Sequence, residues 1–180
     1  MSGPAAITGF RERFGEPADT PALVTLILVS LINVAFLPEQ VAIECDRINA
    51  EKRQPFFANG KFLVLEDAGG VAGCVYAEVR GQRGYIGLLA LRPQLEGRGL
   101  GRLLMNRAEA YLAAAGCEAA DLRTISARND LVPKYRHLGY EQSGTTPMPP
   151  EVPLKISCHF ITMSERLPPQ QTNEPSRGRN

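Results

Sequence analysis

The sequence predicts one domain of the α/β class, in its α+β or mixed form, and three observations lead to that class. The chain has 180 residues, of which 44% are hydrophobic and 22% charged, as expected of one soluble domain. Short apolar runs separated by glycine turns predict antiparallel hairpins. Farther on, a strand-like run, an amphipathic helix and another strand-like run predict a parallel crossover. We expect the domain to span residues 1–166 and the polar tail at 167–180 to be disordered.

A strand and two helices are predicted before the hairpins. Residues 6–14 alternate weakly between apolar and polar types, which predicts the first strand. The apolar run at 22–38 predicts a buried core helix, because the segment Asp19–Pro21 supplies a capping side chain and a proline at the first helical position. This run is also short for a membrane span, which needs roughly 20 apolar residues. Residues 38–53 predict a second, more polar helix.

Three strands follow in hairpin order. Residues 61–67 and 71–81 predict two strands joined by a glycine turn. Alternation in the longer strand predicts two faces, one with Val71, Gly73, Val75, Ala77 and Val79, the other with Cys74, Tyr76, Glu78 and Arg80. Residues 85–93 are apolar almost throughout, which predicts a central strand covered on both faces.

The second half predicts alternating helices and strands. Residues 100–115 carry an apolar stripe at helical spacing, and Gly116 is a suitable C-terminal cap. A strand at 118–127, a short helix at 129–140 and a final strand at 154–167 complete the order.

Charge and cysteine content limit the partners and the compartment. The net charge is +1, which argues against nucleic acid as a partner, because backbone binding requires a large basic surplus. We also expect no membrane partner. The four cysteines form neither a CxxC pair nor a Cys/His cluster, which argues against a metal site and favours a reducing, cytoplasmic setting; they are Cys45, Cys74, Cys117 and Cys158.

Three glycines at alternate positions stand where the helix at 100–115 must begin. Gly97, Gly99 and Gly101 permit positive φ and close approach to the backbone, while no capping side chain satisfies the first N–H groups of the helix. Spare N–H donors, the helix dipole and the flanking Arg98 and Arg102 predict an anion site. The spacing matches neither the P-loop nor the GxGxxG dinucleotide motif. A tight turn with no ligand is the alternative.

Two segments, taken together, are similar to GNAT-type N-acetyltransferases. The segment LALRPQLEGRGLGRLL resembles the cofactor-binding motif of that family, in which the matching residues are Leu89, Leu91, Pro93, Gly99 and Gly101. The segment ARNDLVPKYRHLGYEQSG resembles a later motif of the family, through Asn129, Tyr135, Leu138, Gly139 and Tyr140. The order of predicted elements also fits the family from about residue 6 to residue 166.

The resemblance implies a fold, a cofactor and a set of binding residues. It implies a mixed, mostly antiparallel sheet of about six or seven strands with about four flanking helices and splayed central strands. It implies acetyl-CoA as donor, with the pyrophosphate on the N–H groups of residues 97–102 and the pantetheine arm along the backbone of Leu89 and Leu91. Asn129 would lie near that arm. The cofactor-binding residues that we expect are therefore Leu89, Ala90, Leu91, Gly97, Arg98, Gly99, Leu100, Gly101, Arg102 and Asn129.

Two departures from the family pattern bear on these expectations. Glu96 stands where the family usually has Gln or Arg, and a carboxylate there repels a pyrophosphate unless it faces solvent or pairs with a nearby arginine. The spacing from Asn129 to Tyr135 is also one residue shorter than usual, and Pro133 is expected to interrupt the helix.

The implied chemistry is direct acetyl transfer to a primary amine of a small molecule or a protein. Tyr135 is the candidate acid for the leaving sulfur, since a phenol stays protonated at neutral pH, and the Leu91 N–H is a candidate oxyanion donor. The base is open between Glu78, for which a solvated surface role is the better explanation, and ordered water. His159 fits a core histidine better than a base.

The acceptor and the alternative functions stay open at this point. The pocket is expected between the first two helices and residues 48–60, where Asp46, Arg47, Phe56 and Phe57 are candidates for acceptor recognition. A homodimer is also open. One alternative is a CoA-binding sensor of the same fold without turnover. A nucleotide-binding protein is a third reading, which the failed motif spacings disfavour.

Overall fold

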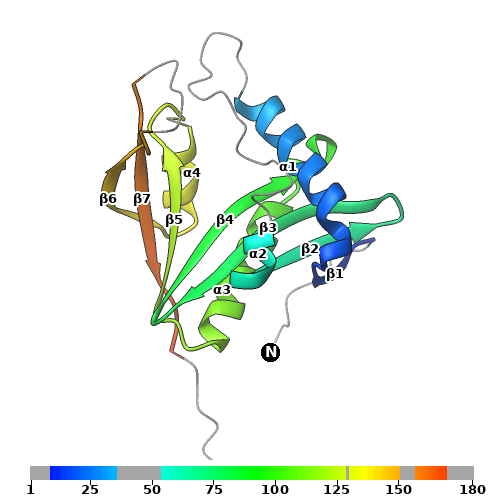
Figure 1. Ribbon diagram of the computed structural model, residues 1–180, viewed down its shortest axis with the longest axis horizontal. Coiled ribbons are helices and arrows are strands. Elements are labelled where there is room, and N and C mark those ends of the chain that lie inside the picture. The colour runs from blue at the N-terminus through cyan, green and yellow to red at the C-terminus, as the bar shows by residue number, and fades with distance from the viewer. Residues whose placement is uncertain (1–8, 36–53, 129, 151–156, 170–180) are drawn as a thin grey trace, which may run out of the picture.

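The protein is a mixed, mostly antiparallel seven-stranded sheet with helices on both faces (Figure 1). This computed structural model describes residues 9–35, 54–128, 130–150 and 157–169. The elements are β1 (Arg11–Phe14), α1 (Thr20–Ala35), α2 (Gln54–Asn59), β2 (Lys61–Asp67), β3 (Gly70–Arg80), β4 (Arg83–Leu91), α3 (Leu100–Ala114), β5 (Ala119–Ile125), α4 (Leu131–His137), β6 (Glu141–Pro147) and β7 (His159–Arg166). The strand order is β1-β2-β3-β4-β5-β7-β6, and only β4 and β5 pair in parallel. The predicted fold class is confirmed.

Two apolar layers cover the two faces of the sheet. On one face, α1 buries Leu23, Leu26 and Ile27 against side chains of β2, β3 and β4, and α2 lies beside it (Figure 1). On the other face, α3 contributes the largest share of a second cluster, which also contains side chains of β3, β4, β5 and β7. The partly buried side chains of α4 pack against that second cluster. The sheet therefore separates an α1/α2 side from an α3/α4 side.

The helices differ from the sequence prediction in their caps and in one location. Asp19 does not cap α1, because its carboxylate accepts bonds from Arg13 and from the Glu16 N–H instead. The predicted helix at 38–53 lies outside the described residues. The short helix α2 forms where a loop was expected, so that part of the prediction is wrong. No helix within the described ranges has both the length and the apolar character needed to cross a membrane.

A bulge in β3 changes which face one residue occupies. Leu65 pairs with Gly73 while Glu66 pairs with Val71, so Ala72 is an extra residue on β3. Alternation therefore restarts at this point. Ala72 packs in the α3 layer, whereas Val71 packs in the α1 layer with Cys74 and Tyr76. The prediction that Val71 shares a face with Val75 is wrong for this reason.

Three cysteines are free thiols in the described part of the chain. Cys74 and Cys117 are buried and Cys158 is partly exposed, whereas Cys45 lies outside the described residues. Burial raises the pKa of the Cys74 thiol to about 12, so this thiol is unreactive at neutral pH.

The pairing of β4 and β5 covers only one end of the two strands. Residues Arg83–Ile86 pair with Ala119–Leu122, and beyond Ile86 the strands diverge into a V (Figure 1). At the closed end, Arg83 bonds Asp121, whose carboxylate also accepts a bond from the Ser164 hydroxyl. A second bulge sets the open end, because Leu88 and Leu89 together stand opposite Val75. Leu88 has φ of 51°, a left-handed conformation that is uncommon outside glycine.

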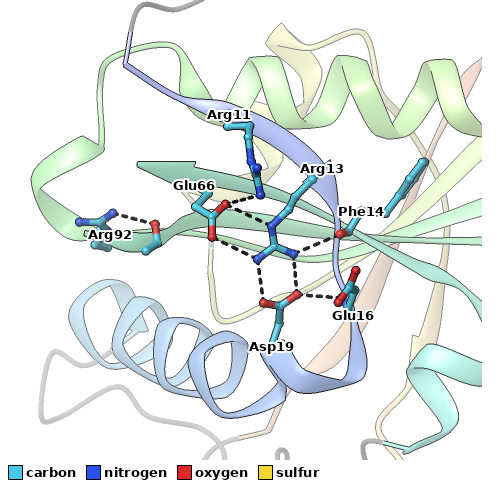
Figure 2. A network of polar contacts seen from close by, with 8 residues as sticks. Arg11, Arg13, Phe14, Glu16, Asp19, Glu66 and Arg92 are labelled. Carbon is cyan, nitrogen blue, oxygen red and sulfur yellow. Dashed lines mark hydrogen bonds and ion pairs between the residues drawn. The ribbon is translucent and has the colours of Figure 1, made fainter. Parts of the chain in front are cut away.

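An ionic network fastens the first strand and α1 to the sheet (Figure 2). Arg13 donates two hydrogen bonds of 2.7 Å to Asp19 and two of 3.3 Å to Glu66. Arg13 and Asp19 are only 22% and 16% exposed, whereas Arg11, which also contacts Glu66, is 73% exposed. The side chain of Arg13 therefore links β1, the entry to α1 and β2.

Replacing Arg13 by alanine is expected to lower the free energy of unfolding by about 2 kcal/mol, the usual loss for charged, partly buried hydrogen bonds. The matched change Arg11→Ala should cost less than about 0.5 kcal/mol, because that pair is exposed. Arg13 lowers the pKa of Asp19 from 3.8, so this stabilisation is present above that pH and is lost as the pH falls through the folded-state pKa. Urea unfolding at pH 7 and pH 3 measures both effects, and equal losses for the two variants would contradict the network.

Candidate functional site

The glycine loop before α3 has the geometry of an anion cradle. Gly97 and Gly99 have φ of 73° and 79°, and Gly99 is the N-cap residue without any side-chain capping bond. The first helical bond joins the Leu103 N–H to the Gly99 carbonyl, which leaves the earlier N–H groups of the turn without a helical acceptor. A Cβ added at Gly97 or Gly99 would meet no atom within 4 Å. These glycines are therefore required by backbone conformation and not by lack of room for a side chain, and the N–H groups at the start of α3 are the kind of donors that bind a phosphate.

The charged side chains near this loop have separate roles. The Arg92 guanidinium donates hydrogen bonds to the Asp67 carboxylate and to the Gly70 carbonyl, so it stabilises the β2–β3 turn and does not pair with Glu96. Glu96 and Arg98 are exposed, and neither forms an ion pair with a described residue. Arg102 donates a bond of 3.3 Å to the His137 carbonyl, which ties the start of α3 to the end of α4. Of the two outcomes expected for Glu96, the structure has the solvent-facing one.

The backbone of β4 presents peptide groups to the open slot. The Arg92 N–H donates to the Ala72 carbonyl at 2.9 Å, so this pair carries the ladder bonds. In an antiparallel ladder the next residue faces the other way, and the N–H and C=O of Leu91 therefore point away from β3. Ala90, opposite Cys74, is 3% exposed, and its side chain packs under α1. Beyond Ile86, the edge of β4 that faces β5 pairs with no strand of the described structure, whereas the opposite edge stays paired with β3. An extended ligand can therefore pair with the edge that faces β5.

A cavity of about 370 Å³ passes through the V between β4 and β5. It is lined by Phe56, Tyr85, Ile86, Gly87, Leu88, Leu89, Met105, Leu122, Arg123, Tyr135 and Phe160. Met105 and Tyr135 belong to the α3/α4 side, which carries the glycine loop. Phe56 and Tyr85 belong to the α1/α2 side. The cavity thus connects the two sides of the sheet at the place where its strands separate.

The end of α4 fixes the position of Tyr135 in this cavity. Gly139 has φ of 104°, and the N–H groups of Gly139 and Tyr140 bond the carbonyls of Arg136 and Tyr135 at 3.0 and 3.1 Å. This is the Schellman motif, in which the residue after the glycine packs on the last helical turn. The Tyr140 ring accordingly meets the Tyr135 ring edge-on at 6.3 Å between centroids. The second sequence motif is therefore a helix stop that orients Tyr135.

Tyr140 also anchors this unit to α3. Its side chain is completely buried, and its hydroxyl donates a bond of 2.8 Å to Glu109. The prediction that Pro133 interrupts this helix is wrong. Helix α4 begins at Leu131, and its first turn needs no N–H donor at position 133. Asn129 lies outside the described residues.

The Tyr135 hydroxyl is chemically available. It makes no hydrogen bond to a described residue, and burial raises the pKa of Tyr135 above the usual value of 10.0. The phenol therefore stays protonated well above neutral pH and can donate its proton into the cavity.

The candidate bases occupy less direct positions. Glu78 accepts bonds from Arg80 at 2.8 Å and from the Tyr76 hydroxyl at 2.9 Å, and does not line the cavity. The bond from Arg80 is the main reason that the pKa of Glu78 is lowered. His159 is exposed at the start of β7, so the expectation of a core histidine is wrong.

The remaining predicted acceptor residues divide into two pairs. Both phenylalanines lie on α2. Phe56 lines the cavity, whereas the ring of Phe57 packs on that of Phe62 on β2. Asp46 and Arg47 lie outside the described residues. Sequence reasoning missed Tyr85, Arg123 and Phe160, because only the partial pairing of β4 with β5 brings these three residues to one cavity.

A partly buried carboxylate, that of Glu165, lies close to Gly139 and to the Tyr140–Glu109 pair. Glu165 on β7 has a buried Oε2 atom without a hydrogen-bond partner in the described structure, and a Cβ at Gly139 would lie 2.6 Å from its Oε1. Burial raises the pKa of Glu165 from 4.5, and burial and the Glu165 charge raise that of Glu109. The hydrogen bond from Tyr140 and, to a smaller extent, the charge of Arg102 oppose the rise in the pKa of Glu109.

Replacing Glu165 by glutamine is expected to stabilise the protein at pH 7 by about 1 kcal/mol or less, because it removes a charge from a partly buried side chain. Between pH 4.5 and the raised folded-state pKa, the native state binds more protons than the unfolded state, so stability falls as the pH rises. The variant should flatten this fall, whereas the matched exposed change Glu141→Gln should not. Melting temperatures from pH 4 to pH 8 provide the measurement, and a destabilised, equally pH-dependent Glu165→Gln variant would contradict the assignment.

Residues 29–140 match the model of the acetyltransferase (GNAT) family. The chain belongs to the GNAT family. The resemblance drawn from the two sequence motifs is therefore confirmed, and acetyl-CoA is the cofactor expected for a member of this family.

Solved structures agree with this GNAT fold at low sequence identity. The ribosomal-protein-S18-alanine N-acetyltransferase of Escherichia coli has a TM-score of 0.67 and 16% identity, over 92% of this chain and 98% of that one. A Salmonella typhimurium protein solved with its cofactor acetyl-CoA has a TM-score of 0.67 and 18% identity, over 93% and 99%. Nourseothricin acetyltransferase has a TM-score of 0.65 and 17% identity, over 89% and 100%. These neighbours share the fold with this GNAT member.

Proposed function

We propose that the chain is an acetyl-CoA-dependent N-acetyltransferase that acts on a primary amine. The observation that carries the proposal is the cavity through the V, which joins the glycine-loop side to the α1/α2 side with Tyr135 on its wall. A donor on one side and an acceptor on the other can meet there without a covalent enzyme intermediate.

The residues present fit acetyl-CoA. The N–H groups at the start of α3, in the segment 97–102, would hold the pyrophosphate, and the free edge of β4 at Leu89–Leu91 would pair with the pantetheine arm. When bound, the cofactor supplies an acetyl group activated as a thioester. The exposed Glu96 weakens this site modestly at most, because backbone N–H groups make most of the proposed contacts.

Tyr135 and Leu91 have the geometry for two parts of the transfer. Tyr135 donates its phenolic proton to the leaving sulfur, a role that its raised pKa favours at neutral pH. The Leu91 N–H, which points into the slot, stabilises negative charge on the carbonyl oxygen. The described wall of the cavity has no carboxylate or imidazole, so we assign removal of the amine proton to ordered water. Glu78, which stands opposite Tyr85 in the β3–β4 ladder, is the alternative base.

Thermal shift and turnover together test the function. Acetyl-CoA should raise the melting temperature by several degrees, whereas ATP and NAD should not. A panel of amines should then release free CoA thiol, and the mass of one product should increase by one acetyl group. Stabilisation by acetyl-CoA without turnover of any amine would instead indicate a CoA-binding sensor. Stabilisation by ATP or NAD alone would overturn both readings.

A further inference from the structure

We propose that the acceptor is a small amino-acid-like amine, with an apolar side chain and a carboxylate that Arg123 binds at the mouth of the cavity. This inference rests on the proposed function and adds the substrate class. It depends on the charge of Arg123, on its lack of an ion pair with a described residue, and on the face of the sheet that it occupies.

The described wall of the cavity carries one formal charge. Ten of its eleven described lining residues are aromatic, aliphatic or glycine, and Arg123 is the eleventh. An apolar wall selects an apolar group, and one fixed cation selects an anion on the same ligand. A simple cationic amine finds no carboxylate on this wall, whereas an amino acid presents a carboxylate to the guanidinium.

Arg123 is free to bind such a group. Its side chain is exposed, and its guanidinium carbon lies 5.9 Å from the centre of the Phe160 ring. No carboxylate among the described residues forms an ion pair with it. Asp121, on the same strand face, bonds Arg83 and Ser164, and the charge of Arg123 helps to lower the pKa of Asp121 without an ion pair between them. The aromatic contact leaves the N–H donors of Arg123 available for the two oxygens of a carboxylate.

Arg123 also lies on the acceptor side of the sheet. Ala120 and Leu122 on β5 pack into the α3 layer. Alternation along the strand therefore places Arg123 on the opposite face, together with Asp121. That face is the one on which Phe56 and Tyr85 line the cavity. The glycine loop for the cofactor belongs to the other face, so the anion recognised by Arg123 is part of the acceptor.

Matched amine pairs provide the experiment. Leucine is compared with isoamylamine and phenylalanine with phenethylamine, because each pair differs only in the carboxylate. Binding is measured calorimetrically to the full chain saturated with CoA, and turnover is measured by thiol release from acetyl-CoA. The carboxylate should increase affinity and kcat/KM at least tenfold.

Three variants assign that preference to Arg123. Arg123→Gln should remove the preference by raising KM and Kd for the amino acids about tenfold to a hundredfold, with a much smaller change for the plain amines, which lack the carboxylate. Arg123→Lys should keep part of the preference. Arg166→Gln is the control, since it makes the same charge change on an exposed residue at the closed end of the sheet.

The outcomes separate this inference from the proposed function. Equal binding of both members of each pair, or no binding of either, overturns the inference, as does a preference that Arg123→Gln leaves intact. Acetylation confined to peptide amines and indifferent to Arg123 also overturns it, while the acetyltransferase function stands. The proposed function itself fails only when acetyl-CoA does not bind or no amine is acetylated.

Discussion

Gly99→Val is expected to lower the affinity for acetyl-CoA by at least about a hundredfold, ~2.7 kcal/mol, while the protein stays folded. Gly99 has φ of 79°, which a β-branched residue adopts only with strain. Relief of that strain rotates the peptide groups at the start of α3, and the N–H donors then no longer converge on one anion. The fold should survive, because Gly99 is exposed and a Cβ atom added to it would meet no atom within 4 Å.

Two controls isolate the effect of Gly99. Gly81→Val introduces the same kind of strain at φ of 66°, in the exposed turn between β3 and β4, and should leave acetyl-CoA affinity unchanged. Gly144→Val on β6 adds the side chain in open space without a positive φ. Calorimetric titration measures affinity and circular dichroism measures the fold. Wild-type affinity in Gly99→Val would show that these glycines serve only the turn.

Tyr135→Phe is expected to lower kcat by about a hundredfold or more, with acetyl-CoA affinity within about threefold of wild type. The hydroxyl has no partner among the described residues, so its removal leaves no buried group unsatisfied. The ring contact with Tyr140 is retained in the variant. The loss should therefore appear in the chemical step and not in stability.

The pH profile tests whether Tyr135 acts as an acid. Since burial raises the pKa of Tyr135 above 10.0, the protonated form predominates through pH 9, and wild-type kcat should not decline from loss of this proton in that range. Tyr111→Phe is the matched control, because Tyr111 lies on α3 outside the cavity and packs on Phe14. Full turnover of Tyr135→Phe across this pH range would rule out the acid role.

The regular elements of the second half were accessible from sequence because their patterns are local. The apolar stripe of α3 depends on helical spacing, and most of it is buried as predicted, although near the end of the helix Ala113 is buried and Ala115 exposed, the reverse of the prediction. The cap at Gly116, with φ of 88°, occurs as predicted. Strand β6 was not singled out, since its residues are mostly exposed and lack apolar alternation. The face of Val71 was missed for a different reason, because a bulge depends on the partner strand. Local patterns thus predicted elements, and pairing decided the faces.

The site was predictable only where the chain itself carries the signal. The glycine loop and Tyr135 stand in contiguous motifs, so the sequence singles out both as candidates. Tyr85 on β4 and Arg123 on β5 lie far apart in the sequence, with α3 between them, and only the short parallel ladder brings their strands together. Tyr85 and Arg123 could therefore be placed at one cavity only from the three-dimensional arrangement.

The short β4–β5 ladder also has a consequence for the order of folding. Strands β1 to β4 form neighbouring antiparallel pairs, and two of those pairs are joined by tight turns. β5 reaches β4 only after the crossover through α3, a non-local contact that closes slowly because it carries a larger loop entropy. We expect the two halves of the sheet to gain protection at different times in pulse-labelling hydrogen exchange, with β5 and β7 after β2 and β3. The cavity lies on the seam between these halves, so it would exist only once the last long-range pairing has formed.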